Sequence, residues 1–264
     1  MENIKGVYVD KLKNGQFNYR ASVTVNKKHI SLGSYPSLES AANAYSYALN
    51  LYNDTTVFLS SYSDDCPLKF EKFITIINLR DNNIYFSNPI YLRKSYFSYF
   101  LSPVDELKFD MDDLFYFSSH KIMKRGNHFF VSDFGMQESV LSRFNIRPFS
   151  VVGRDFVFAN EDRLDFRREN LEIINPYFGV LKKENGSEIY YEVLVHVNGN
   201  LKVGTYEDIT VAAIAYNKAV DTLKKNGINK NFMQNYLEDL SSKEYAAIYS
   251  ATQISDNISD YRQK

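Results

Sequence analysis

The chain has 264 residues, and 31 lysines and arginines against 32 aspartates and glutamates give it a formal net charge of −1 at pH 7. This balance excludes a histone-like polycation. Cys66 is the only cysteine, which excludes an intrachain disulfide, a Cys-x-x-Cys redox site and a cysteine-rich zinc site. The chain has neither a signal-peptide pattern nor an apolar run of about eighteen residues. We therefore expect a cytoplasmic protein with no membrane partner.

Residues 31–50 and 202–221 are two copies of one sequence pattern. Seven identities share a single offset of 171 positions, as from Gly33 to Gly204, and chance rarely produces this. The identical pairs are Gly33 and Gly204, Tyr35 and Tyr206, Ala41 and Ala212, Ala42 and Ala213, Ala44 and Ala215, Tyr45 and Tyr216, and Ala48 and Ala219.

Each copy begins at the end of a stretch in which apolar and polar residues alternate, as they do in strands. Three Asn-Gly pairs supply the positive φ angles of tight hairpin turns: Asn14-Gly15, Asn185-Gly186 and Asn198-Gly199. Alanine and tyrosine then recur at helical spacing, with Ser37 and Asp208 in place as N-caps. Each copy therefore predicts a three-stranded antiparallel meander on which one helix packs closely through its alanines.

The pattern changes between the two copies. There we predict strands within residues 69–86 and 128–134 and an acidic helix over residues 104–117. Residues 232–264 are predicted to form a helical or partly frayed tail. The predicted fold class is α+β, with domains at 1–55, 56–176 and 177–231 followed by that tail.

The first copy resembles the ethylene-response-factor, or integrase-type, DNA-binding domain. Tyr19-Arg20-Ala21 stands where the family commonly has Trp-Arg-Ala, and Tyr35 and Ala41-Ala42 match its turn and helix start. The resemblance implies a sheet that enters the major groove of duplex DNA while the helix supports it from behind. A two-stranded ribbon fits that groove.

Residues 157–175 resemble the C-terminal part of the HNH nuclease finger that occurs beside such domains in phage and mobile-element proteins. Asp165, Arg167 and Asn170-Leu171 match family positions. The resemblance implies a ββα-like central domain, of which Phe158, Asn160, Asp165 and Asn170 are the remnant. The imidazoles of the family are missing, because its Asp-His falls on Val157-Phe158, its central asparagine on Phe166, and its upstream Met-His-Arg on Leu141-Ser142-Arg143.

Phenylalanine can neither act as a general base nor hold a divalent cation. The resemblance therefore predicts a degenerate nuclease without catalytic residues, metal or other cofactor. His120 and His128 with Asp133 do not have a recognised metal-ligand spacing. His29 and His196 lie on predicted strands, where groove contact or simple exposure is expected. The alternative is an active Mg²⁺-dependent homing endonuclease whose displaced ligand set is His120, His128, Asn160 and Asn170.

Basic residues in the first copy are the main candidates for DNA contact, with Arg20 as the groove reader and phosphate attraction from its neighbours. The candidates there are Lys11, Lys13, Tyr19, Arg20, Lys27 and Lys28. In the centre, Arg163, Arg167 and Arg168 either hold a DNA backbone or pair with Asp162, Asp165 and Glu169.

The second copy has its own basic candidates, Lys182, Lys183 and Lys202, but Glu184, Glu188 and Glu192 lie among them. Glu192 takes the place of Arg20 if one gap is allowed, so this copy is expected to bind DNA weakly or to bind protein. A further acidic set comprises Asp105, Glu106, Asp110, Asp112 and Asp113. We interpret that set as the solvated face of the predicted helix, with a paired-acid site or an imitation of phosphates as alternatives.

These observations lead to one main hypothesis and two alternatives. The main hypothesis is a phage or mobile-element protein, located in the cytoplasm of a bacterial host, that binds duplex DNA through two sheet modules without cutting it. Two modules on one chain raise affinity if their spacing suits the target. One alternative is the active endonuclease. The other is an inhibitor of a host nucleic-acid enzyme, a nuclease or ribonucleoprotein such as a CRISPR effector.

Overall fold

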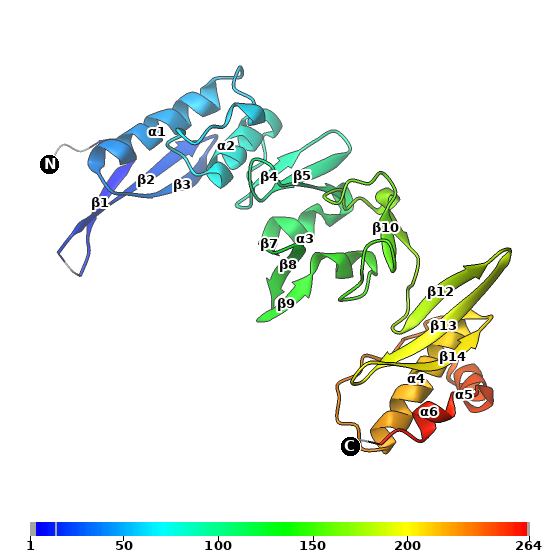
Figure 1. The fold of residues 1–264 in the computed structure, drawn as a ribbon. Coiled ribbons are helices and arrows are strands. Elements are labelled where there is room, and N and C mark those ends of the chain that lie inside the picture. The colour runs from blue at the N-terminus through cyan, green and yellow to red at the C-terminus, as the bar shows by residue number, and fades with distance from the viewer. Residues whose placement is uncertain (1–3, 14, 263–264) are drawn as a thin grey trace. The chain divides into compact units, whose positions relative to one another are not determined.

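The computed structural model describes residues 4–13 and 15–262. The chain divides into two compact units (Figure 1), of which unit 1 comprises Met1–Val140 and Asp162–Asn170 and unit 2 comprises Leu141–Glu161 and Leu171–Lys264. The fold is α+β, with small antiparallel sheets and short helices, as predicted. Among the described residues, no helix has both the length and the apolar composition needed to cross a bilayer.

Unit 1 begins with the first predicted module. Strands β1 (Val7–Lys11), β2 (Phe17–Val25) and β3 (Lys28–Tyr35) form an antiparallel meander, and helix α1 (Leu38–Asn53) packs on it. The Ser37 hydroxyl accepts the Ser40 N–H at 3.1 Å, which confirms the predicted N-cap. Three alanines of α1 are fully buried against the sheet, as the alanine pattern predicted: Ala41, Ala44 and Ala48. Of the predicted Asn14-Gly15 turn, Asn14 lies outside the described residues.

The remainder of unit 1 departs from the sequence prediction at two places. Residues 69–86 were predicted to hold a strand and instead form helix α2 (Phe70–Asn82). Residues 104–117 were predicted to be one helix and instead form strand β6 (Glu106–Asp110), the 3-10 turn η2 (Met111–Asp113) and the short helix α3 (Leu114–Ser119). The strand predicted within residues 128–134 is confirmed as β8 (His128–Asp133).

Two further three-stranded sheets complete unit 1. Strands β4 (Ile90–Leu92) and β5 (Tyr96–Phe100) join β6, while β7 (Met123–Arg125) and β9 (Met136–Ser139) flank β8. Short 3-10 turns occur at η1 (Leu59–Ser61), η3 (Val140–Phe144) and η4 (Arg168–Asn170).

Aromatic packing holds residues 162–170 onto unit 1. Phe166 is 2 % exposed, stacks on Phe109 at a centroid distance of 5.5 Å and meets Phe129 edge-on at 5.8 Å. Phe109 in turn lies 4.3 Å from Phe117. Backbone hydrogen bonds secure the same segment along β6, because the Lys108 N–H donates to Leu164 at 2.9 Å and the Phe166 N–H donates to Lys108 at 2.8 Å. The segment therefore belongs to the core of unit 1.

Tyr99 in this core makes unit 1 sensitive to alkali. Burial raises the pKa of Tyr99 to about 12, and the Ile122 N–H donates to its hydroxyl at 3.0 Å. In the unfolded chain a tyrosine titrates near 10, so only the unfolded state releases this proton between pH 10 and 12. We expect the free energy of unfolding to fall through that window by up to about 1.4 kcal/mol per pH unit for this group.

Urea unfolding of the wild type and of Tyr99→Phe at pH 8 to 11.5 measures this effect. The variant is expected to be less stable at pH 8 by about 1 kcal/mol, because the Ile122 N–H loses its acceptor. It is also expected to lose less stability as the pH rises. Parallel pH profiles for the two proteins would contradict the prediction.

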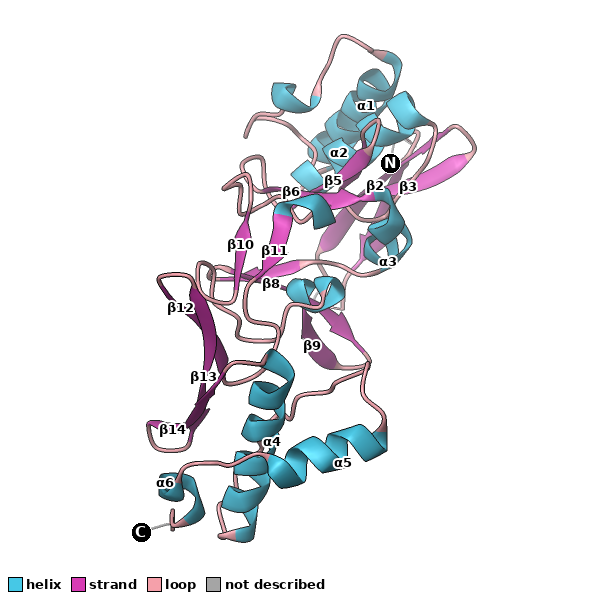
Figure 2. Cartoon of the chain, turned by 90° about the vertical axis from the view of Figure 1, so that its right-hand side faces the viewer, coloured by secondary structure: helices cyan, strands magenta, loops and turns pink. Residues whose placement is uncertain are grey.

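Unit 2 contains the second predicted module. Strands β12 (Val180–Asn185), β13 (Glu188–His196) and β14 (Asn200–Tyr206) form the same meander, and helix α4 (Ile209–Lys225) covers one face (Figure 2). Asp208 caps α4 by accepting the Val211 N–H at 2.9 Å, as predicted. Each module has a register shift at the corresponding point of its central strand, between Ala21 and Ser22 and between Val193 and Leu194. The predicted repeat is therefore confirmed as a repeat of structure.

A glycine in each module lets a helix tyrosine lie against the backbone at the start of the first strand. Gly6 has a φ of +77° and Gly179 a φ of +69°, a backbone conformation that residues other than glycine rarely adopt. A Cβ on Gly6 would overlap the ring of Tyr45, and a Cβ on Gly179 would overlap the ring of Tyr216. The carbonyls of these glycines accept the N–H of Ser22 and of Leu194, each at 2.8 Å, beside the register shift.

The rest of unit 2 consists of a small hairpin and a docked tail. Strands β10 (Phe156–Phe158) and β11 (Leu171–Ile173) pair with each other, and residues 150–179 form no α-helix, so the expected ββα arrangement of an HNH finger is not shown. The tail contains helices α5 (Ser242–Ala251) and α6 (Asp256–Ser259), as the prediction of a helical tail required. The Lys218 ammonium donates to the Tyr249 and Thr252 carbonyls at the end of α5.

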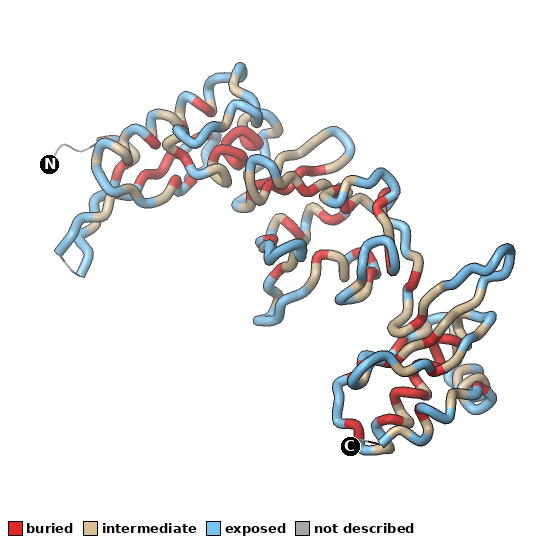
Figure 3. The backbone as a smooth tube through the Cα atoms, viewed as in Figure 1, coloured by how far each residue is buried: buried red, intermediate tan, exposed pale blue. Residues whose placement is uncertain are grey.

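A buried asparagine ties the chain between α4 and α5 to the module. The Asn235 side chain bonds both the N–H and the C=O of Phe178, at 2.6 and 3.1 Å, and its backbone bonds the Asn217 side chain twice at 2.8 Å. Ile258 of α6 is fully buried in the same core. Figure 3 shows buried positions along α4, and residues 212–217 at its N-terminal end are buried on every side.

Candidate nucleic-acid interface

The sheet of the first module has one face free of the helix, which we call the open face. Strand alternation places Val7, Ala21 and Val23 in the core, and it places the exposed Tyr8, Arg20 and Thr24 on the open face. Tyr8 and Arg20 are cross-strand partners on that face; Tyr8 is 53 % exposed and the Arg20 side chain 56 % exposed. Arg20 is therefore an exposed side chain on the open face, as the predicted role of groove reader requires.

Polar side chains lie along the open face on either side of Arg20. The Asn18 amide donates to the Ser34 hydroxyl at 3.3 Å, and Thr24 contacts the His29 ring at 3.3 Å. Asp10 is the only carboxylate within the three strands, and it lies 2.6 Å from the Arg20 Nε. Tyr19, a sequence candidate for DNA contact, is half-buried on the helix side, so the open face does not include it.

Exposed lysines lie at both ends of the same sheet. Lys11 and Lys13 are at the turn between β1 and β2, while Lys27 and Lys28 are at the turn between β2 and β3. Lys28 also lies 4.7 Å above the Tyr85 ring. The strand between the two ends, Phe17–Val25, is about 26 Å long at roughly 3.3 Å per residue, against a major groove about 12 Å wide. The two pairs of lysines are thus separated by more than the width of a major groove, with Arg20 between them.

The second module has a glutamate where the first has Arg20. Glu192 pairs with Leu181 and Thr205 across the sheet, as Arg20 pairs with Tyr8 and Ser34. The inferred correspondence with one gap is therefore confirmed by the register. Of the basic candidates in this module, Lys202 lies 3.1 Å from Glu192 and Lys182 lies 2.9 Å from Glu184. Lys183 is exposed and pairs with Tyr190 across the sheet.

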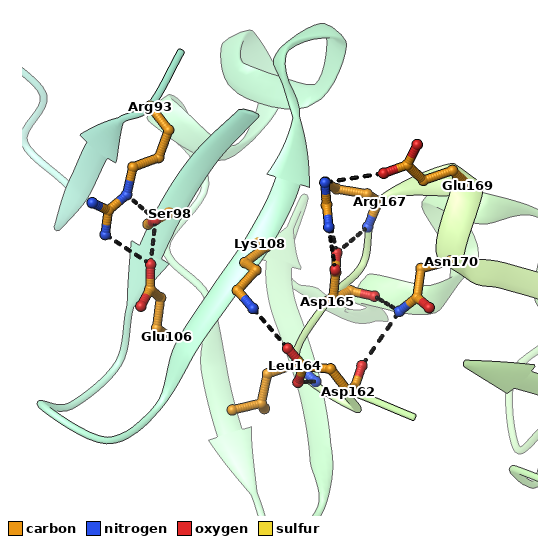
Figure 4. A network of polar contacts seen from close by, with 10 residues as sticks. All are labelled: Arg93, Ser98, Glu106, Lys108, Asp162, Leu164, Asp165, Arg167, Glu169 and Asn170. Atoms are coloured by element: carbon orange, nitrogen blue, oxygen red, sulfur yellow. Dashed lines mark hydrogen bonds and ion pairs between the residues drawn. The ribbon is translucent and has the colours of Figure 1, made fainter. Parts of the chain in front are cut away.

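The central arginines are engaged by carboxylates of unit 1. Figure 4 shows Arg167 directed at Asp165, whose carboxylate it meets through Nε at 2.9 Å and Nη2 at 2.6 Å. Asp165 is fully buried, and its contact holds the pKa of Arg167 above its usual range. Arg167 also pairs with Glu169 at 3.0 Å, so the pairing alternative of the sequence analysis describes it.

Arg168 binds acids outside that predicted set. Its guanidinium meets both oxygens of the buried Asp113 at 2.7 and 3.2 Å and lies 3.5 Å from Asp110. Arg163 is exposed and makes no ion pair among the described residues. Of the three central arginines, Arg163 alone has a guanidinium that no carboxylate of the described chain engages.

The acidic set of residues 105–113 forms ion pairs within unit 1 and is not a helix face. Asp105 pairs with Lys124 at 2.8 Å and Glu106 with Arg93 at 3.0 Å, while Asp110 and Asp113 bind Arg168. Asp112 lies in η2. These contacts explain four of the five acids as structural partners of basic side chains.

The HNH-like residues fall in both units. Asp165 and Asn170 are buried in unit 1, where the Asn170 amide donates to the Asp165 carbonyl at 2.8 Å, and Lys108 pairs with Asp162 at 2.7 Å in the same network (Figure 4). Phe158 and Asn160 belong to unit 2, with Phe158 8 % exposed beside Phe156. Phe158 and Phe166 are packing residues, and a hydrocarbon ring offers neither a base nor a metal ligand.

The histidines form no cluster with other metal-binding side chains in the described part of the chain. His120 Nε2 lies 3.6 Å from Asp133, and its ring stacks on Tyr116 at 4.1 Å. His128 is exposed at the start of β8. Among the described residues, no three His, Cys, Asp or Glu side chains come together to hold a metal ion.

Comparison with protein-family models, with curated proteins and with solved structures finds no match to this chain.

The structure identifies a buried polar centre in unit 2 that the sequence analysis did not predict. The buried Asp155 carboxylate accepts from the Val151 N–H and from two arginines, Arg147 and Arg154. The adjacent Arg154-Asp155 pair was its only sequence signal.

Proposed function

We propose that this protein binds duplex DNA through the open face of its first module and does not cleave it. The observation that carries this proposal is Arg20, exposed beside Tyr8 on a sheet face with lysines at both ends. A β-ribbon fits the major groove, where an arginine distinguishes guanine from the other bases. The sequence resemblance to the ethylene-response-factor domain supports the same use of the sheet.

The residues at the HNH positions favour binding without cleavage. The family's histidine and central asparagine positions hold Phe158 and Phe166, both buried. We attribute residues 157–175 to a former nuclease finger of a phage or mobile-element protein, on sequence resemblance. In this account Asp165, Arg167 and Asn170 have kept a structural role after the catalytic groups were lost.

The central test is an electrophoretic shift of duplex DNA titrated against salt. Contacts with several phosphates release counterions, so the affinity is expected to fall steeply between 50 and 200 mM salt. Arg20→Ala is expected to weaken binding by about tenfold or more, because one bidentate contact with a base contributes roughly 1–3 kcal/mol. Glu192→Ala, the same change at the corresponding place in the second module, is the matched control and is expected not to weaken binding.

The same reactions, supplied with Mg²⁺ or Mn²⁺ and plasmid DNA, test cleavage. Intact plasmid is the expected result. Nicking that a chelator abolishes would favour the endonuclease alternative with His120, His128, Asn160 and Asn170. Equal affinity of Arg20→Ala and the wild type would overturn the role of the open face.

The second candidate function is inhibition of a host nucleic-acid enzyme through the second module. Glu192 in the place of Arg20 favours it, together with a groove of about 600 Å³ lined by Glu188, Ile189, Tyr190, Thr205, Tyr206 and Glu207. The lining of this groove has carboxylates and tyrosines but no lysine or arginine. Such a lining is complementary to the basic surface of a protein that itself binds nucleic acid. This function predicts that the protein inhibits a purified CRISPR effector and that Glu192→Lys abolishes the inhibition. It also predicts that the protein gives no salt-sensitive shift of DNA.

A further inference from the structure

The ion pair between Arg20 and Asp10 is formed through a particular atom of the guanidinium. The contact of 2.6 Å joins Asp10 Oδ2 to the Arg20 Nε. Asp10 and Arg20 are diagonal neighbours on the open face, since Asp10 pairs with Asn18 and Arg20 with Tyr8. Their side chains are 45 % and 56 % exposed, and such pairs add little to stability. A role in stabilising the fold therefore does not account for the pair.

The choice of Nε has a consequence for recognition. A guanidinium is a rigid planar group with one N–H on Nε and the rest on the two Nη atoms. The Asp10 carboxylate beside Nε restrains the guanidinium at that end, while the two Nη atoms carry the donors that could meet another acceptor. Guanine presents two adjacent acceptors, O6 and N7, in the major groove, and these match two parallel N–H donors.

We propose that Asp10 is a positioning residue that orients Arg20 for a bidentate contact with guanine in the major groove. This inference rests on the proposed DNA binding and names the base that the open face reads. Without Asp10 the long arginine side chain samples many rotamers, and it also reaches phosphates of any sequence. Asp10 therefore raises specificity while its charge opposes non-specific attraction.

The second module has the opposite charges at the same two places. Lys183 stands where Asp10 stands, because Lys183 pairs with Tyr190 as Asp10 pairs with Asn18. Glu192 stands where Arg20 stands. A carboxylate at the reading position cannot donate to O6 or N7, so each chain carries one guanine-reading face. The second module thereby offers a place to rebuild the pair.

The test begins with the full chain and a pool of random-sequence duplexes, from which bound DNA is selected and sequenced. The enriched duplex is then compared with an unrelated duplex and with a version carrying 7-deazaguanine, which lacks the N7 acceptor. Asp10→Asn is expected to lose about tenfold in affinity for the enriched duplex and none for the unrelated one. It is also expected to bind the 7-deazaguanine duplex as well as it binds the enriched one.

Glu39→Gln is the matched control, because it removes one exposed negative charge from α1 of the same module. Electrostatics alone predicts that both substitutions raise affinity slightly for every duplex. An equal rise for Asp10→Asn on both duplexes would overturn the positioning role. If the wild type shifts no duplex at all, the proposed function itself fails, and this outcome differs from unselective effects of Asp10→Asn.

Rebuilding the pair in the second module is the complementary measurement. In a chain carrying Arg20→Ala, the double substitution Lys183→Asp with Glu192→Arg is expected to restore guanine-dependent binding in part. Glu192→Arg alone is expected to restore only binding that ignores sequence. Equal, guanine-dependent recovery by the single substitution would show that the carboxylate is not needed.

Discussion

Gly179→Ala is expected to destabilise unit 2 by about 3 kcal/mol. Two terms add: the positive φ costs an L-residue roughly 1–2 kcal/mol, and overpacking costs typically 1–3 kcal/mol. Here the new methyl would overlap the Tyr216 ring and the Leu194 carbonyl, and the carbonyl cannot easily move because it lies in the sheet. Amide hydrogen exchange of the full chain measures the effect, with exchange in β13 and α4 expected to accelerate about a hundredfold.

Two other glycines are controls for this substitution. Gly186 has a φ of +63°, but beyond its two chain neighbours no atom lies within 4 Å of the place that a Cβ would take, so Gly186→Ala is expected to cost only about 1 kcal/mol. Gly6→Ala repeats the overlap with Tyr45 in unit 1, and it is expected to accelerate exchange in β2 and α1 while leaving α4 unchanged. Similar effects of Gly179→Ala and Gly186→Ala would show that the tyrosine contact is unimportant.

The modules were predictable because several independent local signals agree in them. Alternation, Asn-Gly turns, N-caps at Ser37 and Asp208 and the alanine stripe all require the same meander and helix. The glycine contacts were missed, although the repeated Gly-Val at residues 6–7 and 179–180 was a visible signal for them. The sequence does not show that a helix tyrosine will pack against these glycines, so it gives no reason why glycine is needed before the strand.

The central segment misled because its patterns are ambiguous. Residues 73–79 of α2 are all buried, so the helix has no polar stripe, and its β-branched run is typical of a strand. In β6 the buried Leu107 and Phe109 alternate with partly exposed residues, a period of two that acidic neighbours made resemble a helix face. Burial in the tertiary structure determines whether each segment forms a helix or a strand, and a short stretch of sequence does not specify that burial.

The candidate site was predictable only where it depends on strand alternation. Arg20 could be placed on a sheet face, and Glu192 in its stead, from the repeat alone. The contacts of Arg168 with Asp110 and Asp113 join residues more than fifty positions apart, as Figure 4 likewise illustrates for Lys108 and Asp162. Such pairs follow from the packing of residues 162–170 on β6, which no local pattern specifies.

Asp155→Ala is expected to cost unit 2 about 3 kcal/mol or more, since removing one partner of a buried ion pair leaves the other charge uncompensated. The Asp155 side chain is 1 % exposed and accepts from Arg147 at 3.2 Å, Arg154 at 2.6 Å and the Val151 N–H at 2.8 Å. Burial already lowers the pKa of Arg147, whose guanidinium lies 5.0 Å from the Phe178 ring.

Arg154→Ala distinguishes the contribution of the exposed Arg154 from that of the buried Arg147, since both pair with Asp155. Arg154 is 54 % exposed and Arg147 only 14 %, so Arg154→Ala is expected to cost less than about 1 kcal/mol. Replacing both buried partners, Arg147→Met with Asp155→Leu, is expected to recover much of the stability lost in Asp155→Ala, because no buried charge then remains unpaired and the exposed Arg154 stays in contact with water. Exchange in β12 and β13 reports all three variants. If the double variant were less stable than Asp155→Ala, the buried charge of Arg147 would not be the main cause of the loss. The hydrogen bonds from Arg147 to the Asn175 carbonyl and from the Val151 N–H to Asp155 would then be what stabilises this part of unit 2.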